Sequence, residues 1–188
     1  QVLRAVLQKL GKPYADAIYH LSYGMVDLPS GKMKSREGTV VDADELVREV
    51  VEAAKQATLE KGKTEGLTEQ EAEQLYHMLG LGALKYYLLK VDPKKRMLFN
   101  PEESVSLEGH TGPFIQYSHA RIRSILRKAQ EQGLAADAPL AVLTELHATE
   151  RDMVQELVRY AAVVQEAART QSPAVVAQYA YDVAKAYN

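Results

Sequence analysis

Apolar residues recur at helical spacing along most of this chain. They return every three or four positions near residues 2–10, 43–61, 69–89 and 112–131, and again from residue 140 to the last residue. Residues 16–23 mix two periodicities and are predicted as a short strand that leads into a charged loop. The pattern predicts a mainly α protein, in which a small α/β segment up to about residue 40 precedes a helical bundle.

Local signals sharpen the helix boundaries. Helix ends are expected at Gly11, Gly62 and Gly133, and helix starts after Asp42, Thr68, Asn100, Thr111 and Ser172. Thr68 with Glu71 forms a capping box, which supports the start of the 69–89 helix. Gly80 and Gly82 predict that this helix approaches another helix closely. A break is expected near residues 147–149, within the stretch 140–170.

Composition narrows the class of protein. The 188 residues are 46% apolar and 26% charged, which is ordinary for a globular chain with one sizeable core or two small ones. Without a membrane span or a secretory signal, a cytoplasmic location is the default. The absence of cysteine and the wide spacing of five histidines predict no metal site. A net charge of −2 argues against nucleic-acid binding by bulk electrostatics.

Both ends of the chain indicate a fragment. The first helical stretch begins directly after Gln1, and helical spacing continues to the last residue without a glycine cap or a polar tail. We therefore expect the chain to belong to a longer protein.

A cationic loop is the first candidate site. Residues 32–36 place three cations in five positions, between Gly31 and Gly38. Such a loop suits a polyphosphate, because cations reach phosphate oxygens while glycines let the backbone approach the ligand. The alternative is an ordinary solvated turn. Residues 91–96 are also basic, and there a solvated loop is the favoured interpretation.

One face of the 112–131 helix is the second candidate. At about 100° per residue, Phe114, Tyr117, Arg121 and Lys128 share a ridge. The predicted apolar centre of this helix is formed by Ile115, Ile122, Ile125 and Ala129. Two aromatic rings beside a guanidinium suit unpaired RNA bases and a phosphate, although aromatic residues at the rim of a core are the alternative.

The two candidate segments resemble signatures of one family. Residues 23–44, around Lys32-Met33-Lys34-Ser35-Arg36, resemble the KMSKS-type loop of class I aminoacyl-tRNA synthetases, specifically the arginyl-tRNA synthetases. Residues 110–124 resemble the signature that opens the anticodon-binding helical domain of the same family. The order of the two motifs is also that of the family, and the resemblance covers essentially the whole chain.

The resemblance implies a fold class and a division of the chain. Residues 1–41 would be the end of a Rossmann-type catalytic domain, residues 42–99 connecting helices that contact the tRNA stem, and residues 100–188 an α-helical anticodon-binding domain that is truncated at its end. The parent enzyme would activate arginine with ATP, as its Mg²⁺ complex and without a tightly bound cofactor, and attach it to tRNA(Arg).

The resemblance also assigns roles to loop residues. Lys32 and Lys34 would be catalytic, stabilising the charge that develops on the triphosphate. Ser35 stands where the general motif has its second lysine, so either Lys34 replaces that lysine or another lysine of the parent does. The implied ATP-binding residues are Met33, Ser35, Arg36, Gly24 and Val26.

The second motif implies contacts to tRNA. The residues carried over are Phe114, Gln116, Tyr117, His119, Arg121 and Arg123. Tyr179 and Tyr181 either extend this surface or pack in the core. The chain holds no His-x-Gly-His motif, so the isolated chain is expected to be inactive, and the parent is expected to be a cytoplasmic monomer that binds no membrane. The alternatives are a stand-alone tRNA-binding module without catalysis and a purely structural bundle.

Overall fold

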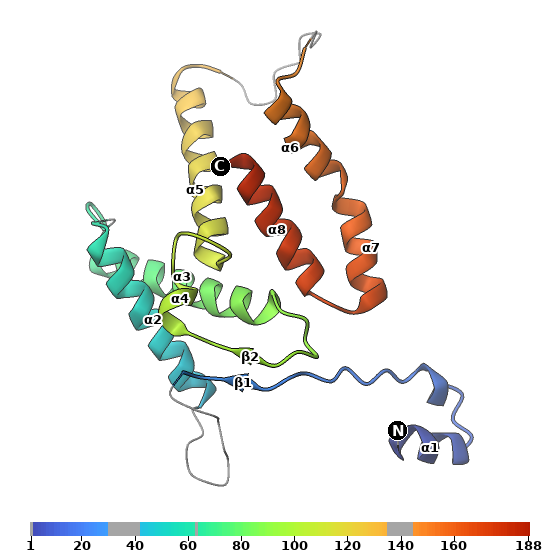
Figure 1. Cartoon of the computed structure of the whole chain (residues 1–188). Helices are drawn as coiled ribbons and strands as arrows, with labels where there is room; N and C mark the ends of the chain where they lie inside the picture. Colours follow the sequence, from blue (N-terminus) through green and yellow to red (C-terminus); the bar gives the residue numbers. More distant parts are fainter. Residues whose placement is uncertain (1, 30–41, 63, 135–144) are drawn as a thin grey trace.

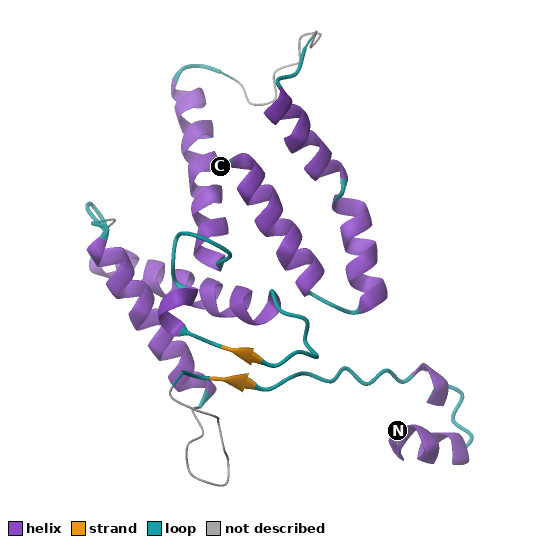
Figure 2. Cartoon of the chain, in the orientation of Figure 1, coloured by secondary structure: helices purple, strands orange, loops and turns teal. Residues whose placement is uncertain are grey.

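The computed structural model describes residues 2–29, 42–62, 64–134 and 145–188. Its elements are α1 (Val2–Lys9), the 3₁₀ helix η1 (Ala15–Ala17), β1 (Val26–Asp27), α2 (Ala43–Glu60), α3 (Glu69–Leu89), β2 (Met97–Leu98), α4 (Pro101–Ser104), α5 (Gly112–Glu131), α6 (Ala148–Val158), α7 (Tyr160–Thr170) and α8 (Ala174–Tyr187). Helices dominate, as Figures 1 and 2 show, which confirms the predicted class.

β1, β2 and α4 lie beside α2 and α3, which cross closely in Figure 1, whereas α1 packs against η1 away from this pair. A methyl group added at Gly80 would lie 2.8 Å from the Cα of Val51, so only glycine permits this approach. The predicted close contact at Gly80 is therefore confirmed. The core cluster beside it consists of Leu28, Leu46, Val50, Ala54, Ala83, Leu84, Phe99 and Val105.

A two-stranded parallel sheet joins distant parts of the chain. β1 pairs with β2, with Val26 opposite Met97 and Asp27 opposite Leu98. The prediction of a strand over residues 16–23 is wrong, because η1 occupies its start and residues 18–25 have no strand assignment. An extended segment becomes a strand only where another backbone satisfies its N–H and C=O groups, and β2 runs beside residues 26–27.

The second half forms a layer of four helices. α8 packs against α5 on one side and against α6 and α7 on the other (Figure 1). The predicted apolar centre of α5 is wrong in part, because Ile122 and Ile125 are 36% and 55% exposed. Ser118 lies on the same face but is buried, because α8 covers this face near Ser118 and ends there, where the Asn188 side chain donates to the Ser118 hydroxyl.

Capping explains most helix boundaries. The capping box of Thr68 and Glu71 is confirmed, with the Glu71 amide 3.3 Å from the Thr68 hydroxyl. Helices also begin after Asp42, Asn100 and Thr111, whose side chains accept backbone N–H groups. Near the expected break, His147 caps the start of α6, and a second break falls at Arg159 between α6 and α7.

Candidate functional site

The structure describes the residues on either side of the cationic loop. The catalytic candidates Lys32 and Lys34, and the ATP-binding candidates Met33, Ser35 and Arg36, lie outside the described residues. The chain enters the loop after Leu28, a buried member of the core cluster, and leaves it at Asp42, which caps α2. Both flanks are thus anchored on the same α2–α3 core.

Of the two other ATP-site candidates, Gly24 lies just before β1 and Val26 lies in it. The Gly24 N–H donates to the carbonyl of Pro93 at 2.6 Å, and a methyl group at this glycine would lie 2.1 Å from the Lys95 carbonyl oxygen. Only glycine allows this approach of two backbones. Val26 is half-buried and packs on the core, so one side of this segment is already occupied by protein.

An ion pair that the sequence did not suggest holds the same segment. Arg96 donates from Nη2 to Oδ1 of Asp27 at 2.8 Å and from Nε to Oδ2, which gives a bidentate pair. The hydrogen bond to Asp27, together with the charge of that carboxylate, raises the pKa of Arg96. The predicted solvated loop over residues 91–96 is confirmed, since Lys94, Lys95 and Arg96 are exposed, although Pro93 and Arg96 also contact the β1 segment. A basic run gives no indication of a partner 69 positions away.

The tRNA-site candidates on α5 divide into two groups. Phe114 faces α8, with its ring centroid 5.4 Å from that of Tyr181, and Arg121 donates a hydrogen bond to the Asn188 side chain. Tyr117 is 44% exposed, and His119 and Arg123 are also exposed. The predicted ridge therefore splits, because α8 covers part of it and leaves the Tyr117 ring accessible.

Gln116 lies against a different helix. Its Nε2 donates to the carbonyl of Met78 at 3.2 Å, and a methyl group at Gly82 would lie 2.4 Å from that nitrogen. The glycine thus makes room for the carboxamide, and the predicted close contact at Gly82 is confirmed. The Gln116 Oε1 is buried without a hydrogen-bond partner in the described part of the chain, and such an acceptor is costly to leave unsatisfied.

An aromatic junction joins the two halves. The His110 ring lies 5.6 Å from Tyr86 and 4.2 Å from Tyr181 between centroids, and the Tyr86 hydroxyl donates to the carbonyl of Ala177 at 3.1 Å. Lys90 donates to the His110 carbonyl at 2.9 Å. Burial lowers the pKa of His110, and the nearby Lys90 lowers it further. One sequence signal pointed to this junction, since His110 opens the second motif.

Burial also shifts the pKa values of the groups around this junction. It lowers the pKa of Lys90 and raises that of Tyr86 above the ordinary value for a phenol. Lys90 further lies over the ring of Tyr87, with Nζ 4.1 Å from the centroid. The hydrogen bonds of Tyr86 and Lys90 join α3 to α8 and to His110, just before α5.

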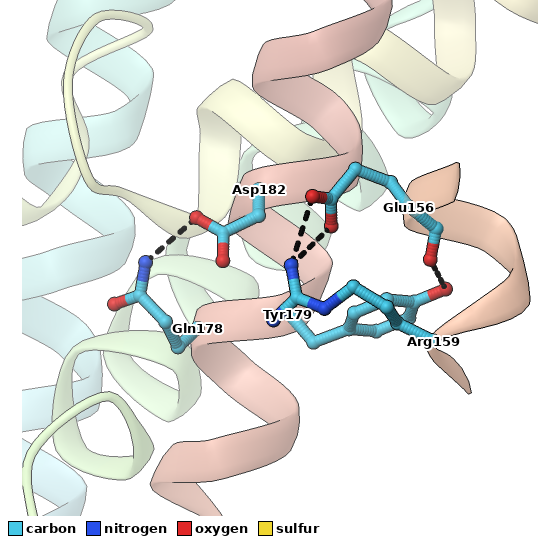
Figure 3. A network of polar contacts seen from close by, with 5 residues as sticks. All are labelled: Glu156, Arg159, Gln178, Tyr179 and Asp182. Atoms are coloured by element: carbon cyan, nitrogen blue, oxygen red, sulfur yellow. Dashed lines mark hydrogen bonds and ion pairs between the residues drawn. The ribbon is translucent and has the colours of Figure 1, made fainter. Parts of the chain in front are cut away.

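A polar network ties α8 to α6 (Figure 3). The Tyr179 hydroxyl donates to the backbone carbonyl of Glu156 at 3.1 Å, and Arg159 pairs with the Glu156 carboxylate at 2.7 Å. Gln178 donates to Asp182 at 2.8 Å on the neighbouring turn of α8. Contacts with Glu156 of α6 and with the ring of Tyr160 of α7 thus account for Tyr179, as contacts with His110 and Phe114 do for Tyr181.

Residues 2–29, 42–62, 64–134 and 145–188 contain no cluster of three or more His, Asp or Glu side chains that could hold a metal ion. In the same ranges, no helix is both long and apolar enough to cross a membrane. On α5 the structure exposes the Tyr117 ring and, further round the same helix, the basic side chains of His119 and Arg123.

Family models assign both halves of the chain. Residues 1–100 match the catalytic domain of class I (R) tRNA synthetases, and residues 115–188 match the DALR anticodon binding domain. The fold and the paired regions are thus those of a class I synthetase with a helical anticodon-binding domain.

Relatives identify the particular synthetase. The arginine–tRNA ligase of Flavobacterium psychrophilum is 54% identical over the whole chain, and that of Amoebophilus asiaticus is 52% identical. The chain belongs to the arginyl-tRNA synthetase family. It spans about 30% of the length of the first of these relatives and 32% of the second.

Solved structures agree with this assignment. The arginyl-tRNA synthetase of Thermus thermophilus superposes with a TM-score of 0.83 at 34% identity, over 98% of this chain and 29% of that one. The arginyl-tRNA synthetase of Plasmodium falciparum, with a TM-score of 0.66 and 21% identity, covers 88% of this chain and 27% of its own length, and it shows the common fold.

Proposed function

We propose that this chain is part of an arginine–tRNA ligase, which activates arginine with ATP and transfers it to tRNA(Arg). The observation that carries the proposal is the succession of a class I catalytic segment and an anticodon-binding domain in one chain, at 54% identity to a ligase. The chain would supply the cationic loop and the tRNA-binding helices, with residues 1–41, 42–99 and 100–188 as its three parts.

The cationic loop would act on ATP. In our proposal Lys32 and Lys34 stabilise the negative charge that develops as pyrophosphate leaves, while Met33, Ser35 and Arg36 help to hold the nucleotide. Gly24 and Val26 would contribute backbone near the adenine. The anchoring of both flanks on the α2–α3 core supports this role, because preorganised cations need a rigid base. Magnesium would arrive with ATP as part of the substrate.

The exposed side chains of α5 would bind tRNA. Tyr117, His119 and Arg123 are accessible and combine an aromatic ring with basic groups, which suits single-stranded RNA. Phe114 and Arg121 would act at the edge where α5 meets α8, and Gln116 would orient α5 on α3. We expect the ligase to work as a cytoplasmic monomer.

Arginine-dependent pyrophosphate exchange by the whole ligase tests the catalytic part. Lys32→Ala and Lys34→Ala should each reduce kcat by about 10²–10³-fold, the range for removing one group that stabilises developing charge. Lys12→Ala, an exposed lysine outside the loop, is the matched control and should change little. Unchanged exchange in both loop variants would contradict the proposed roles.

Fluorescence anisotropy with arginine tRNA and a non-cognate tRNA tests the proposed binding of tRNA by α5. The double variant Tyr117→Ala/Arg121→Ala should lose cognate-selective binding, and a salt series separates that loss from non-specific attraction. Lys185→Ala on exposed α8 surface is the control for removal of one cation. Full selectivity in the double variant would place tRNA recognition elsewhere.

A further inference from the structure

The segment that follows α3 lies beside the chain that leads into the cationic loop. Three backbone hydrogen bonds join residues 93–99 to residues 24–27. The Gly24 N–H donates to the Pro93 carbonyl at 2.6 Å, the Met97 N–H to the Met25 carbonyl at 3.0 Å and the Phe99 N–H to the Asp27 carbonyl at 2.7 Å. β1 and β2 have only two residues each, and so short a pairing is marginal without further contacts.

Contacts with α3 fix the second of these segments. Phe99 is buried in the α2–α3 core, with its ring 5.0 Å from that of Tyr87 between centroids. The Tyr87 hydroxyl also donates to the Leu98 carbonyl at 3.0 Å. Arg96 therefore directly precedes a strand that is anchored on a close-packed core, and it can serve as a fixed support for groups on β1.

Arg96 holds Asp27 through the planar fork of its guanidinium. Nη2 donates to Oδ1 at 2.8 Å and Nε donates to Oδ2, which fixes the carboxylate in direction as well as in distance. A fully exposed ion pair usually contributes little. In this pair the Asp27 side chain is only 15% exposed, whereas that of Arg96 is 53% exposed. Removal of the guanidinium would leave a mostly buried carboxylate without this cation, which favours a shift of β1.

We propose that Arg96 is a positioning residue for the ATP-dependent activation of arginine, because it fixes Asp27 and thereby the backbone that leads into the cationic loop. This role rests on the proposed function, since it needs Lys32 and Lys34 to act on ATP. Lys32 follows Asp27 by five positions. Leu28 also anchors this backbone on the core, but an apolar contact has no direction, whereas the fork sets the direction in which the chain continues.

Pyrophosphate exchange by the whole ligase tests this role. A misplacement of about 1 Å can cost about 10²-fold in rate, so Arg96→Gln should lower kcat by about 10- to 100-fold. The KM for arginine should stay within about twofold, because the loop is proposed to act on ATP in the transition state. Arg96→Lys keeps the charge but cannot hold both oxygens as a fork, so it should recover only part of the loss.

Arg169→Gln is the matched control. Arg169 forms a forked pair of the same kind with Glu166 on α7, with Nε and Nη2 at 2.9 Å and 2.7 Å from the carboxylate oxygens. Arg96→Gln and Arg169→Gln should both lower the Tm slightly, because each removes one such pair. Well below either Tm, only Arg96→Gln should lower kcat. Equal kcat values in the two variants would show a purely structural pair and overturn the positioning role.

A double variant shows whether Arg96 acts through Asp27. Asp27→Ala should also lower kcat, and the addition of Arg96→Gln to it should cause no further loss, because the partner is already absent. A further loss of similar size would mean that Arg96 contacts ATP or tRNA directly, which overturns the positioning role.

Lys32→Ala and Lys34→Ala in the same assay separate this role from the proposed function. If they lose exchange while Arg96→Gln retains it, the positioning role is overturned and the proposed function stands. If both keep the exchange rate of the wild type, the proposed function of the loop is overturned, and the role of Arg96 with it. If the wild type shows no arginine-dependent exchange, both are overturned.

Discussion

Each half of this molecule is stabilised internally by a different kind of contact. Around α2 and α3, eight buried apolar residues form one continuous cluster that includes Val50 and Phe99. After Pro113, the buried apolar side chains of the described residues are Val163 and Ala184, while Leu157 and Val158 are 52% and 76% exposed. The second half relies instead on hydrogen bonds and aromatic contacts along α8.

This difference matches the tasks that we propose for the two halves. A rigid apolar core suits a base that must hold loop cations in place, because displaced cations stabilise a transition state poorly. A layer of helices with exposed side chains and polar joints suits a surface that adapts to RNA. The comparison also predicts that equivalent changes in the two halves have unequal effects.

The largest effect is expected from Phe99→Ala. This side chain is 0% exposed and packs edge-on against Tyr87 at 5.0 Å between centroids, so its loss should lower the free energy of unfolding by about 3–5 kcal/mol. Ile125→Ala on α5 is the matched control and should change it by less than about 0.5 kcal/mol. Urea unfolding followed by circular dichroism measures both. Equal losses would mean that the second half has an apolar core of similar weight.

A smaller effect is expected from Gly80→Ala. The added methyl would lie 2.8 Å from the Val51 Cα, so α2 and α3 must separate, at about 1–3 kcal/mol of unfolding free energy. Lys85→Ala, on an exposed position of the same helix, is the control. A stabilising effect, as expected for Gly→Ala in an unconstrained helix, would show that this contact is loose.

Much of this architecture was predictable from local sequence signals. Caps such as Thr68 with Glu71 depend on residues three positions apart, so a short stretch of sequence contains both partners. The prediction of a strand over residues 16–23 failed because strand formation depends on a distant partner. That partner is Met97–Leu98, and it pairs with residues 26–27. The ion pair of Asp27 with Arg96 and the contact of Gln116 with Gly82 were not predicted, for the same reason.

The site was predictable to a different degree. Helical angles identified the exposed Tyr117, but they placed Ile122 and Ile125 in the core, since periodicity shows which residues share a face and not which neighbour covers it. α8 covers this face at Ser118 and ends near Arg121, so Ile122 and Ile125, which lie further along the same face, are left exposed. The roles of Lys32 and Lys34 remain predictions.

Tyr86→Phe tests the joint between the halves. It removes the hydroxyl that donates to Ala177 on α8, which should lower the free energy of unfolding by about 0.5–1.5 kcal/mol. Amide hydrogen exchange should increase in α8 and remain unchanged in the α2–α3 core. Tyr160→Phe, an exposed tyrosine on α7, is the control. Faster exchange in both halves would show that they unfold as one unit.

The smallest effect is a pH dependence at the same joint. Burial and Lys90 lower the pKa of His110 below its ordinary value of 6.5, while Asp182 opposes them, so the folded protein favours the neutral ring. In the unfolded chain the His110 ring binds a proton near pH 6.5. The stability that His110 contributes to the folded protein is therefore complete above that pH, and it is lost as the pH falls toward the lower, folded-state pKa.

Thermal unfolding between pH 7.5 and 5.5 measures this contribution. The Tm of the wild type should fall as the pH decreases, and the fall should be shallower in His110→Asn, which has no titrating ring. Because Tyr86 and Tyr181 enclose the ring, the wild type should also lose α3–α8 contact first, visible as faster exchange in α8 at the lower pH. An equal slope in His110→Asn would assign the pH dependence to other groups and leave this joint insensitive to protons.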